Sequence, residues 1–136
     1  MMNDFSSRLA LYWPALIDGA ITTLWLCAIG MLLGFILGVV IHLIANGRSP
    51  AGRAFTRVYV SFFRGTPMLA QLLLLFYLPS ALGLDVPPMV AAAVALALNT
   101  AAYQSQILSS GFAAIPKGQM EAAAVFAIGK YKTLFH

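Results

Sequence analysis

The sequence predicts an all-α membrane protein with three transmembrane helices followed by a short cytoplasmic helix. The first observation is composition: 61% of the 136 residues are hydrophobic and 9% are charged. Soluble domains average about 45–50% apolar and about 25% charged residues. The second is spacing, because uncharged stretches cover residues 19–47, 65–84 and 86–116. Each stretch reaches the roughly 20 residues that a helix needs to cross the hydrocarbon core.

The placement of basic residues is the third observation and predicts an orientation. Lys and Arg cluster in two segments that would lie on the same side of the membrane. Arg48, Arg53, Arg57 and Arg64 follow the first span, and Lys117, Lys130 and Lys132 follow the third. Basic residues collect on the cytoplasmic side of membrane proteins. We therefore expect a multi-pass chain with its N-terminus outside. The net charge of +4 indicates topology in the bilayer and not nucleic-acid binding.

Residues 1–20 are expected to form a periplasmic interfacial segment. Apolar and aromatic residues recur there at helical spacing: Phe5, Leu9, Tyr12, Trp13 and Leu16. Such an amphipathic pattern with Trp and Tyr is typical of a short helix at the membrane interface. An unstructured N-terminal tail is the alternative.

The transmembrane region covers residues 21–110, and its first span runs from about 21 to 45. Gly30, Gly34 and Gly38 recur every fourth residue, on one face of this helix. Glycines in register allow a second backbone to approach closely, so we expect this face to pack against another helix. Residues 46–50, Asn-Gly-Arg-Ser-Pro, end the helix.

The segment 53–64 is amphipathic, with its arginines on one face and aromatic residues on the other. This pattern predicts a helix on the cytoplasmic surface, with the arginines near anionic headgroups. Pro67 lacks an amide proton, so we expect a kink or a helix restart there. The second span follows over about residues 66–84.

The third span, about residues 89–108, carries unusual polarity. Asn99, Tyr103 and Gln106 share one helix face, and Gln71 lies in the second span. Amides in a bilayer need protein partners because lipid offers none. Two readings stay open: these four side chains line a substrate path, or they form hydrogen bonds between helices.

Residues 111–136 are expected to form a cytoplasmic segment with a short helix. Pro116 suits a first helical position, and Glu121 lies where the helix dipole favours negative charge. An apolar stripe follows on one face: Met120, Ala124, Ala127, Tyr131 and Leu134. Such a helix is suited to contact another protein.

Three segments resemble the permease subunits of polar amino-acid ABC importers, the histidine, glutamine, arginine and opine type. Residues 115–123, Ile-Pro-Lys-Gly-Gln-Met-Glu-Ala-Ala, are similar to the EAA loop of these permeases. Residues 63–71, which include Arg64, Gly65, Thr66 and Pro67, resemble their FRGTPLLVQ segment. Residues 98–103 resemble their LNxAAY segment, and the resemblance extends from Gly19 onward.

The resemblance implies a function in amino-acid transport across the bacterial inner membrane. It implies a five-to-six-helix permease fold, of which this chain carries the N-terminal part, and a second permease subunit, identical or different. The EAA loop would form a coupling helix seated on a cytoplasmic ATPase dimer, through Pro116, Lys117, Gly118, Glu121, Ala122 and Ala123. A periplasmic or extracellular binding protein would deliver the amino acid. ATP and Mg²⁺ would bind the ATPase, so we expect no cofactor, no catalytic residue and no enzymatic activity in this chain.

The sequence departs from the family pattern near the inner end of the third span. Gln106 stands where the family has Glu, and Ser109-Ser110 stands where it has Arg-Gly. The family also continues into two further spans beyond the EAA loop, so we expect this chain to be a fragment rather than a reduced protein. Its glycine face and its Asn99–Gln106 face are then expected to lack partners.

A different function class remains as an alternative. A small three-span interaction or regulatory protein could use the Gly30–Gly38 face to bind a larger complex, without transport activity. A membrane enzyme is disfavoured because the spans offer no nucleophile–base pair and no metal-ligand cluster. We interpret His42 as a packed or solvated side chain.

Overall fold

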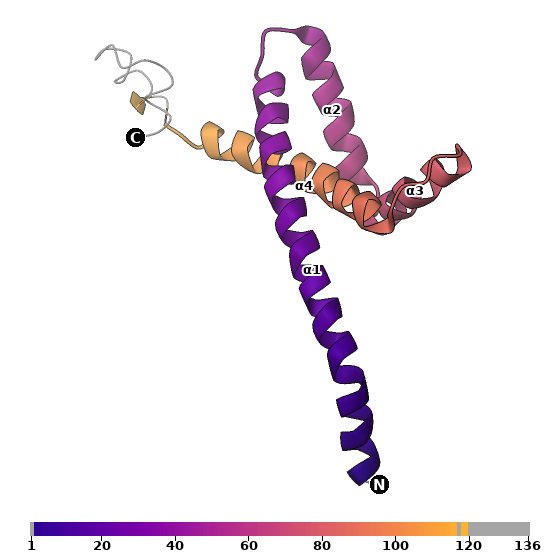
Figure 1. The fold of residues 1–136 in the computed structure, drawn as a ribbon. Coiled ribbons are helices and arrows are strands. Elements are labelled where there is room, and N and C mark those ends of the chain that lie inside the picture. Colours follow the sequence, from indigo (N-terminus) through magenta and orange to yellow (C-terminus); the bar gives the residue numbers. More distant parts are fainter. Residues whose placement is uncertain (1, 117, 120–136) are drawn as a thin grey trace.

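Four helices make up the part of the chain that the structure describes, residues 2–116, 118 and 119 of a computed structural model. They are α1 (Met2–Ala45), α2 (Pro50–Gly65), α3 (Met68–Ala81) and α4 (Pro88–Ala113). Figure 1 shows α1 as a long rod, with the other three helices gathered around the half that leads to its C-terminal end. The described residues contain no strand. The predicted all-α class is confirmed.

Helix α1 is one continuous helix through Pro14. Its 44 residues make it about 66 Å long at 1.5 Å per residue, roughly twice the thickness of a hydrocarbon core. No break separates residues 2–20 from the first span, so the separate interfacial helix expected from the sequence is not seen. Whether this part of α1 lies at a membrane interface stays a prediction.

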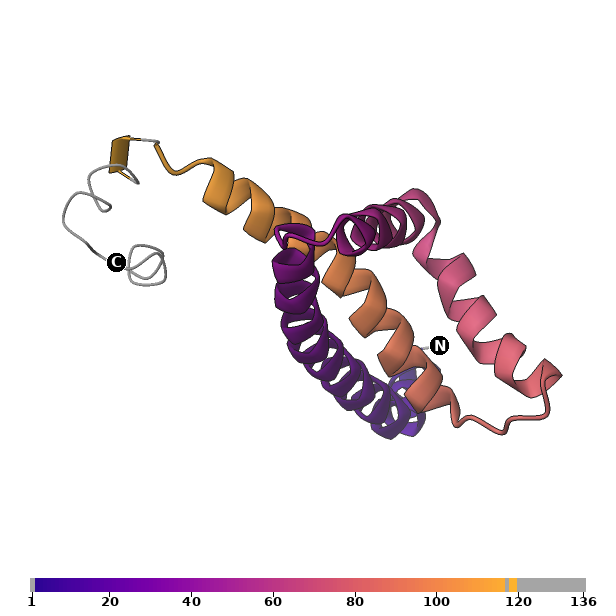
Figure 2. The ribbon, with the colours of Figure 1, turned by 90° about the horizontal axis from the view of Figure 1, so that it is seen from above.

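Helices α1 and α4 pack through the glycine face of α1, and Figure 2 shows them crossing. A Cβ atom added to Gly30, Gly34 or Gly38 would lie 2.7 Å from Leu96 Cβ, 2.6 Å from Thr100 Cβ and 2.7 Å from Gln104 Cβ, respectively. Real Cβ atoms do not approach so closely, so only glycine permits this contact. The buried residues of α4 are all small: Ala91, Ala95, Ala97, Ala101, Ala102 and Ser105.

The expectation that the glycine face lacks a partner is wrong. Thr100 and Gln104, which contact the glycines, belong to the same stretch of α4 as the polar residues 99–106. The glycine face is therefore occupied by the chain's own fourth helix. The alternative function, which needs this face free to bind a larger complex, loses its surface.

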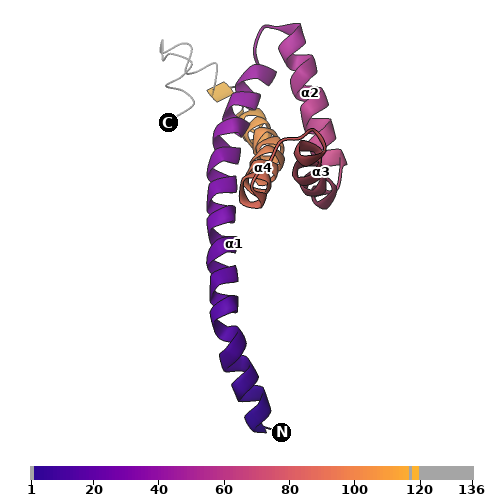
Figure 3. The ribbon, with the colours of Figure 1, turned by 45° about the vertical axis from the view of Figure 1, so that its right-hand side comes forward.

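Helices α2 and α3 are separated by a sharp break. Ser49 Oγ accepts a hydrogen bond from the Gly52 amide and caps α2, whose first residue is Pro50. Such a start is typical, because proline fits the first turn. The two helices are bent by 105° at Thr66 and Pro67, which confirms the break predicted at Pro67. Figure 3 shows α3 turned away from α2 and lying beside α4.

Length and hydropathy support one or two membrane crossings among the described residues. Ala10–Ala45 of α1 is long and apolar enough, and α2 and α3 qualify together as one broken span. Helix α4 has sufficient length, 26 residues, but polar side chains such as Asn99, Gln104 and Gln106 lower its mean hydropathy. The count of three spans stays a prediction.

The outward surfaces of these helices are apolar. Leu24 and Trp25 of α1 are 70% and 63% exposed, as are many large hydrophobic side chains around them. Soluble monomers rarely expose so large an apolar area. The surface therefore fits a lipid environment or contact with further protein.

Candidate functional site: a polar junction and a basic cleft

The break between α2 and α3 is held together by one buried amide. Gln71, in the first turn of α3, is 3% exposed. Its Nε2 donates to Phe63 O at 2.9 Å, to Thr66 O at 3.0 Å and to Thr66 Oγ1 at 2.6 Å. Carbonyls at the end of a helix have no intrahelical partner. Gln71 therefore satisfies the groups that the break in the helix leaves open.

Asn99 joins α4 to the same point. Its Nδ2 donates to Gln71 Oε1 at 2.9 Å and to Phe63 O at 3.3 Å. One turn of α2 earlier, the Tyr59 hydroxyl donates to Leu98 O at 2.7 Å. We call the group of Phe63, Thr66, Gln71 and Asn99 the polar junction. It fixes three helices relative to each other without leaving a donor unpartnered in an apolar setting.

The four predicted path residues do not form one wall. Gln71 and Asn99 form a hydrogen bond with each other. For these two residues, the structure therefore has the hydrogen bond between helices that was the second interpretation of the sequence. Tyr103 is 45% exposed, and the guanidinium carbon of Arg64 lies 5.3 Å from the centre of its ring, within cation–π range. Gln106 lies elsewhere, in a cleft. Tyr103 and Gln106 therefore remain the two side chains of this set that are open to a ligand.

The cleft lies between α1, α2 and α4 and has a volume of about 450 Å³. Side chains from all three helices line it: Ile41, Ala45, Arg53, Thr56, Arg57, Val60, Ser61, Arg64, Ser105, Gln106 and Ser109. We call it the basic cleft, because three of these residues are arginines and none of the described residues that line it is acidic. It is the second polar feature of the molecule.

Arg53, Arg57 and Arg64 of α2 line this cleft, and their proximity to anionic headgroups stays a prediction. The opposite face of the helix is apolar and faces outward, with Phe55 62% and Val58 69% exposed. This arrangement would be unfavourable in water. In a membrane it is ordinary, because charged groups turn to the interior and apolar groups to lipid. The spacing of the arginines predicted their common face, but not which way it points.

Three of the four hydroxyl groups in the cleft donate to backbone carbonyls. Thr56 donates to Arg53 O at 3.1 Å, Ser105 to Ala102 O at 2.8 Å, and Ser109 to Ser105 O at 2.8 Å. Arg53 uses Nη1 to donate to Gly47 O at 3.0 Å, at the C-terminal end of α1. The remaining donors are the guanidinium groups, the Ser61 hydroxyl and the Gln106 amide. The cleft can bind an acceptor-rich, negatively charged group.

His42 is packed and hydrogen-bonded, beside the basic cleft. Its Nδ1 lies 2.9 Å from Ser109 Oγ, and its ring stacks on Phe112 with centroids 5.0 Å apart. Ser109 donates its own proton to Ser105 O, so its oxygen can accept from the His42 ring. Asn46 Nδ2 also lies 3.3 Å from His42 Nδ1. Sequence reasoning found no partner for His42, because Ser109 lies 67 residues away.

The predicted coupling segment falls largely outside the described residues. Lys117, Glu121, Ala122 and Ala123 lie there, so their roles stay predictions. Pro116 and Gly118 are exposed, and the Gln119 amide donates to Pro116 O at 3.0 Å. A turn therefore begins at Pro116. In the described part of the chain, no group of His, Cys, Asp and Glu is placed to hold a metal ion.

Comparison with known proteins gives a consistent family. Residues 30–136 match the family described as the binding-protein-dependent transport system inner membrane component. The L-cystine transport system permease protein TcyB of Bacillus subtilis is 36% identical over 124 residues, which are 91% of this chain and 53% of the relative. The arginine transport system permease protein ArtQ of the same bacterium is 37% identical over 129 residues, which are 94% of this chain and 58% of that protein.

A solved structure shares the arrangement of the helices. It is described as the crystal structure of an amino acid ABC transporter with histidines. The match has a TM-score of 0.86 at 31% sequence identity, and covers 93% of this chain and 59% of that one. The chain therefore spans little more than half the length of the relatives that it matches.

Proposed function

This chain belongs to the binding-protein-dependent transport system inner membrane component family, and on that basis we propose that it forms part of the translocation path of an ATP-driven amino-acid importer. The relatives named above are transport permeases for L-cystine and arginine. A third, from Rickettsia conorii, is a putative glutamine transport system permease protein, 34% identical over 117 residues. Polar amino acids are the substrate class that the names of these relatives share.

The observation that carries the proposal is the broken helix at the polar junction. Transporters commonly use interrupted helices, whose freed backbone groups lie beside the substrate path. Here the interruption at Thr66–Pro67 is braced by Gln71 and Asn99. The bracing supports a fixed bend in an otherwise apolar region, beside which Tyr103 is open to a solute.

The chain would work with three partners that it does not contain. A cytoplasmic ABC ATPase dimer would bind ATP and Mg²⁺ and supply the driving force. A second permease subunit, identical or different, would complete the path, and an amino-acid-binding protein would deliver the substrate from outside. Coupling to the ATPase would run through the segment that begins at Pro116 and includes Glu121.

The placement of charge supports an orientation for this assembly. Arg48 and the arginines of α2 lie at the end of α1 opposite to Asp18. By the positive-inside tendency this end faces the cytoplasm, so the N-terminus lies outside. The coupling segment, which follows α4, would then lie on the same side as the ATPase.

Co-purification with the ATPase tests the coupling role. The full chain carries an affinity tag and is solubilised from membranes that contain its partner ATPase. Glu121→Lys is expected to reduce the recovered ATPase by at least about tenfold, the effect of losing one charge-assisted contact. Asp85→Lys, the same charge reversal in the turn between α3 and α4, serves as the matched control. Equal recovery with both variants would contradict the coupling role.

A further inference from the structure

The basic cleft holds positive charge for which the described lining residues supply no counter-charge. Arg53, Arg57 and Arg64 line it, with Gln106 from α4 facing the same space. A guanidinium is always charged in proteins, so these side chains cannot neutralise themselves. All three arginines are exposed along this open cleft, and basic pockets between helices at the cytoplasmic side of a membrane bind anionic headgroups.

Position along α2 selects the arginines that can act together. Residues 53 and 57 are one turn apart, about 6 Å along the axis, whereas 57 and 64 are about 10.5 Å apart. Arg64 is also engaged with the Tyr103 ring. Arg53 uses Nη1 on the carbonyl of Gly47 and keeps its other donors. Arg53 and Arg57 therefore form the pair that can hold one anion between them.

The donors of this pair suit a phosphate group. Each guanidinium offers a planar fork of N–H groups that matches two oxygens at once. A phosphate diester presents two non-bridging oxygens, so each of the two arginines can donate to one of them. The Ser61 hydroxyl and the Gln106 amide line the same cleft and can add donors to those of the arginines.

The surroundings of the cleft favour a phosphate that belongs to a lipid. Leu43 and Ile44 expose apolar side chains at the adjoining end of α1, next in the chain to Ile41 and Ala45, which line the cleft. A headgroup in the cleft would leave its acyl chains beside these side chains. The cleft also lies at the basic end of the molecule, where anionic headgroups bind basic pockets between helices.

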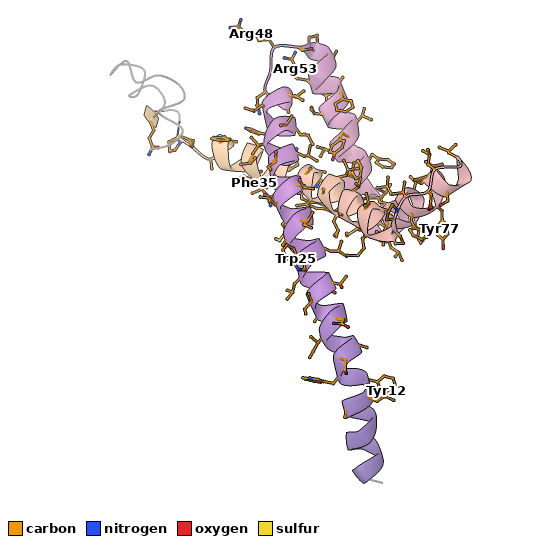
Figure 4. The ribbon with its side chains drawn as sticks, viewed as in Figure 1. Tyr12, Trp25, Phe35, Arg48, Arg53 and Tyr77 are labelled. Atoms are coloured by element: carbon orange, nitrogen blue, oxygen red, sulfur yellow. The ribbon has the colours of Figure 1, made fainter. Side chains whose placement is uncertain are left out.

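We infer that the basic cleft is a binding site for one phosphate group, held by Arg53 and Arg57 and carried by an anionic phospholipid. The inference is independent of which solute the chain transports. Figure 4 shows Arg53 on the side of α2 that faces α1, and Arg48 at the tip of the turn, pointing away from the helices. Arg48 is therefore a matched control: the same side chain, close in the sequence, but not lining the cleft.

Native mass spectrometry of the full chain in a neutral detergent tests this site. Phosphatidylglycerol is expected to bind with one tight site per chain, and phosphatidylcholine more weakly. Arg57→Gln is expected to weaken phosphatidylglycerol binding about tenfold, while Arg48→Gln leaves it within about twofold. Circular dichroism checks that both variants keep their helices. Equal weakening by the two substitutions would overturn the inference, because it would show that only overall charge matters.

A second variant tests the site even if Arg57→Gln fails to fold. Gln106→Glu adds a carboxylate to the cleft and removes no arginine, so it is expected to weaken phosphatidylglycerol binding in the same direction as Arg57→Gln. Unchanged binding in Gln106→Glu would count against the site. Inorganic phosphate at millimolar concentration separates the two sources of the ligand. Displacement of the lipid assigns the site to soluble phosphate, and retention of the lipid assigns it to the headgroup.

Discussion

Substitution of Gly34 by leucine tests the contact that holds α1 against α4. A Cβ atom at this position would lie 2.6 Å from Thr100 Cβ, 2.7 Å from Thr100 Cγ2 and 3.0 Å from Ala97 O. Ordinary carbon contacts are about 3.5–4.0 Å, so the helices would have to separate by about 1 Å for the Cβ atom alone. Ala97 O belongs to the backbone and cannot swing aside.

The magnitude follows from overpacking. Added carbons in a close contact cost about 1–3 kcal/mol, and leucine adds three carbons beyond Cβ, so we expect the upper end, about 3 kcal/mol. Leucine also favours the helix over glycine by roughly 0.8 kcal/mol. Gly19→Leu isolates this second effect, because a Cβ atom at Gly19 meets nothing within 4 Å. The difference between the two variants therefore reports the helix contact.

Unfolding of both variants by sodium dodecyl sulfate in mixed micelles, followed by circular dichroism, measures this difference. Gly34→Leu is expected to lower the free energy of unfolding by about 2–3 kcal/mol relative to Gly19→Leu. Equal stability of the two variants would refute the α1–α4 contact. It would also mean that the glycine face is free to bind another protein, as the alternative function of a small interaction or regulatory protein requires.

Two further predictions concern the polar junction and the topology. Gln71→Leu removes the donor to the Thr66 carbonyl and leaves Asn99 Nδ2 with Phe63 O alone, so it is expected to lower the free energy of unfolding by about 1–3 kcal/mol. An unchanged free energy of unfolding would count against the junction as a brace. For topology, single cysteines at Asp85 and Ser49 in a Cys27→Ser background are treated with an impermeant maleimide. Asp85→Cys is expected to react in intact cells and Ser49→Cys only after permeabilisation; the reverse pattern would invert the orientation.

Several features of the fold could be predicted from short sequence patterns. The row of glycines predicted a close helix contact, and α1 packs against α4 there. The spacing of the arginines predicted an amphipathic helix, which is α2. Pro67 predicted a break, and α2 and α3 are bent there. These features depend on residues near each other in the chain. Steric freedom, helical spacing and the missing proline amide act locally, so sequence alone can reveal them.

Features that depend on distant residues could not be predicted in the same way. Gln71 and Asn99 were both recognised as polar, but their bond joins residues 28 apart. The direction of the arginine face is set by where α1 and α4 lie, not by α2 itself. The separate interfacial helix was expected from the amphipathic pattern with Trp and Tyr in residues 1–20, yet no residue breaks the helix after this segment, and α1 continues to Ala45.

Amino-acid uptake in cells tests the central claim most directly. A strain that lacks this chain is supplied with radiolabelled cystine, glutamine or arginine, and then with the chain restored as wild type or as Glu121→Lys. The account predicts that uptake of at least one of these amino acids depends on the wild-type chain and is lost with Glu121→Lys, while Asp85→Lys retains it. Uptake of all three that is indifferent to the presence of the chain would contradict a role in amino-acid import.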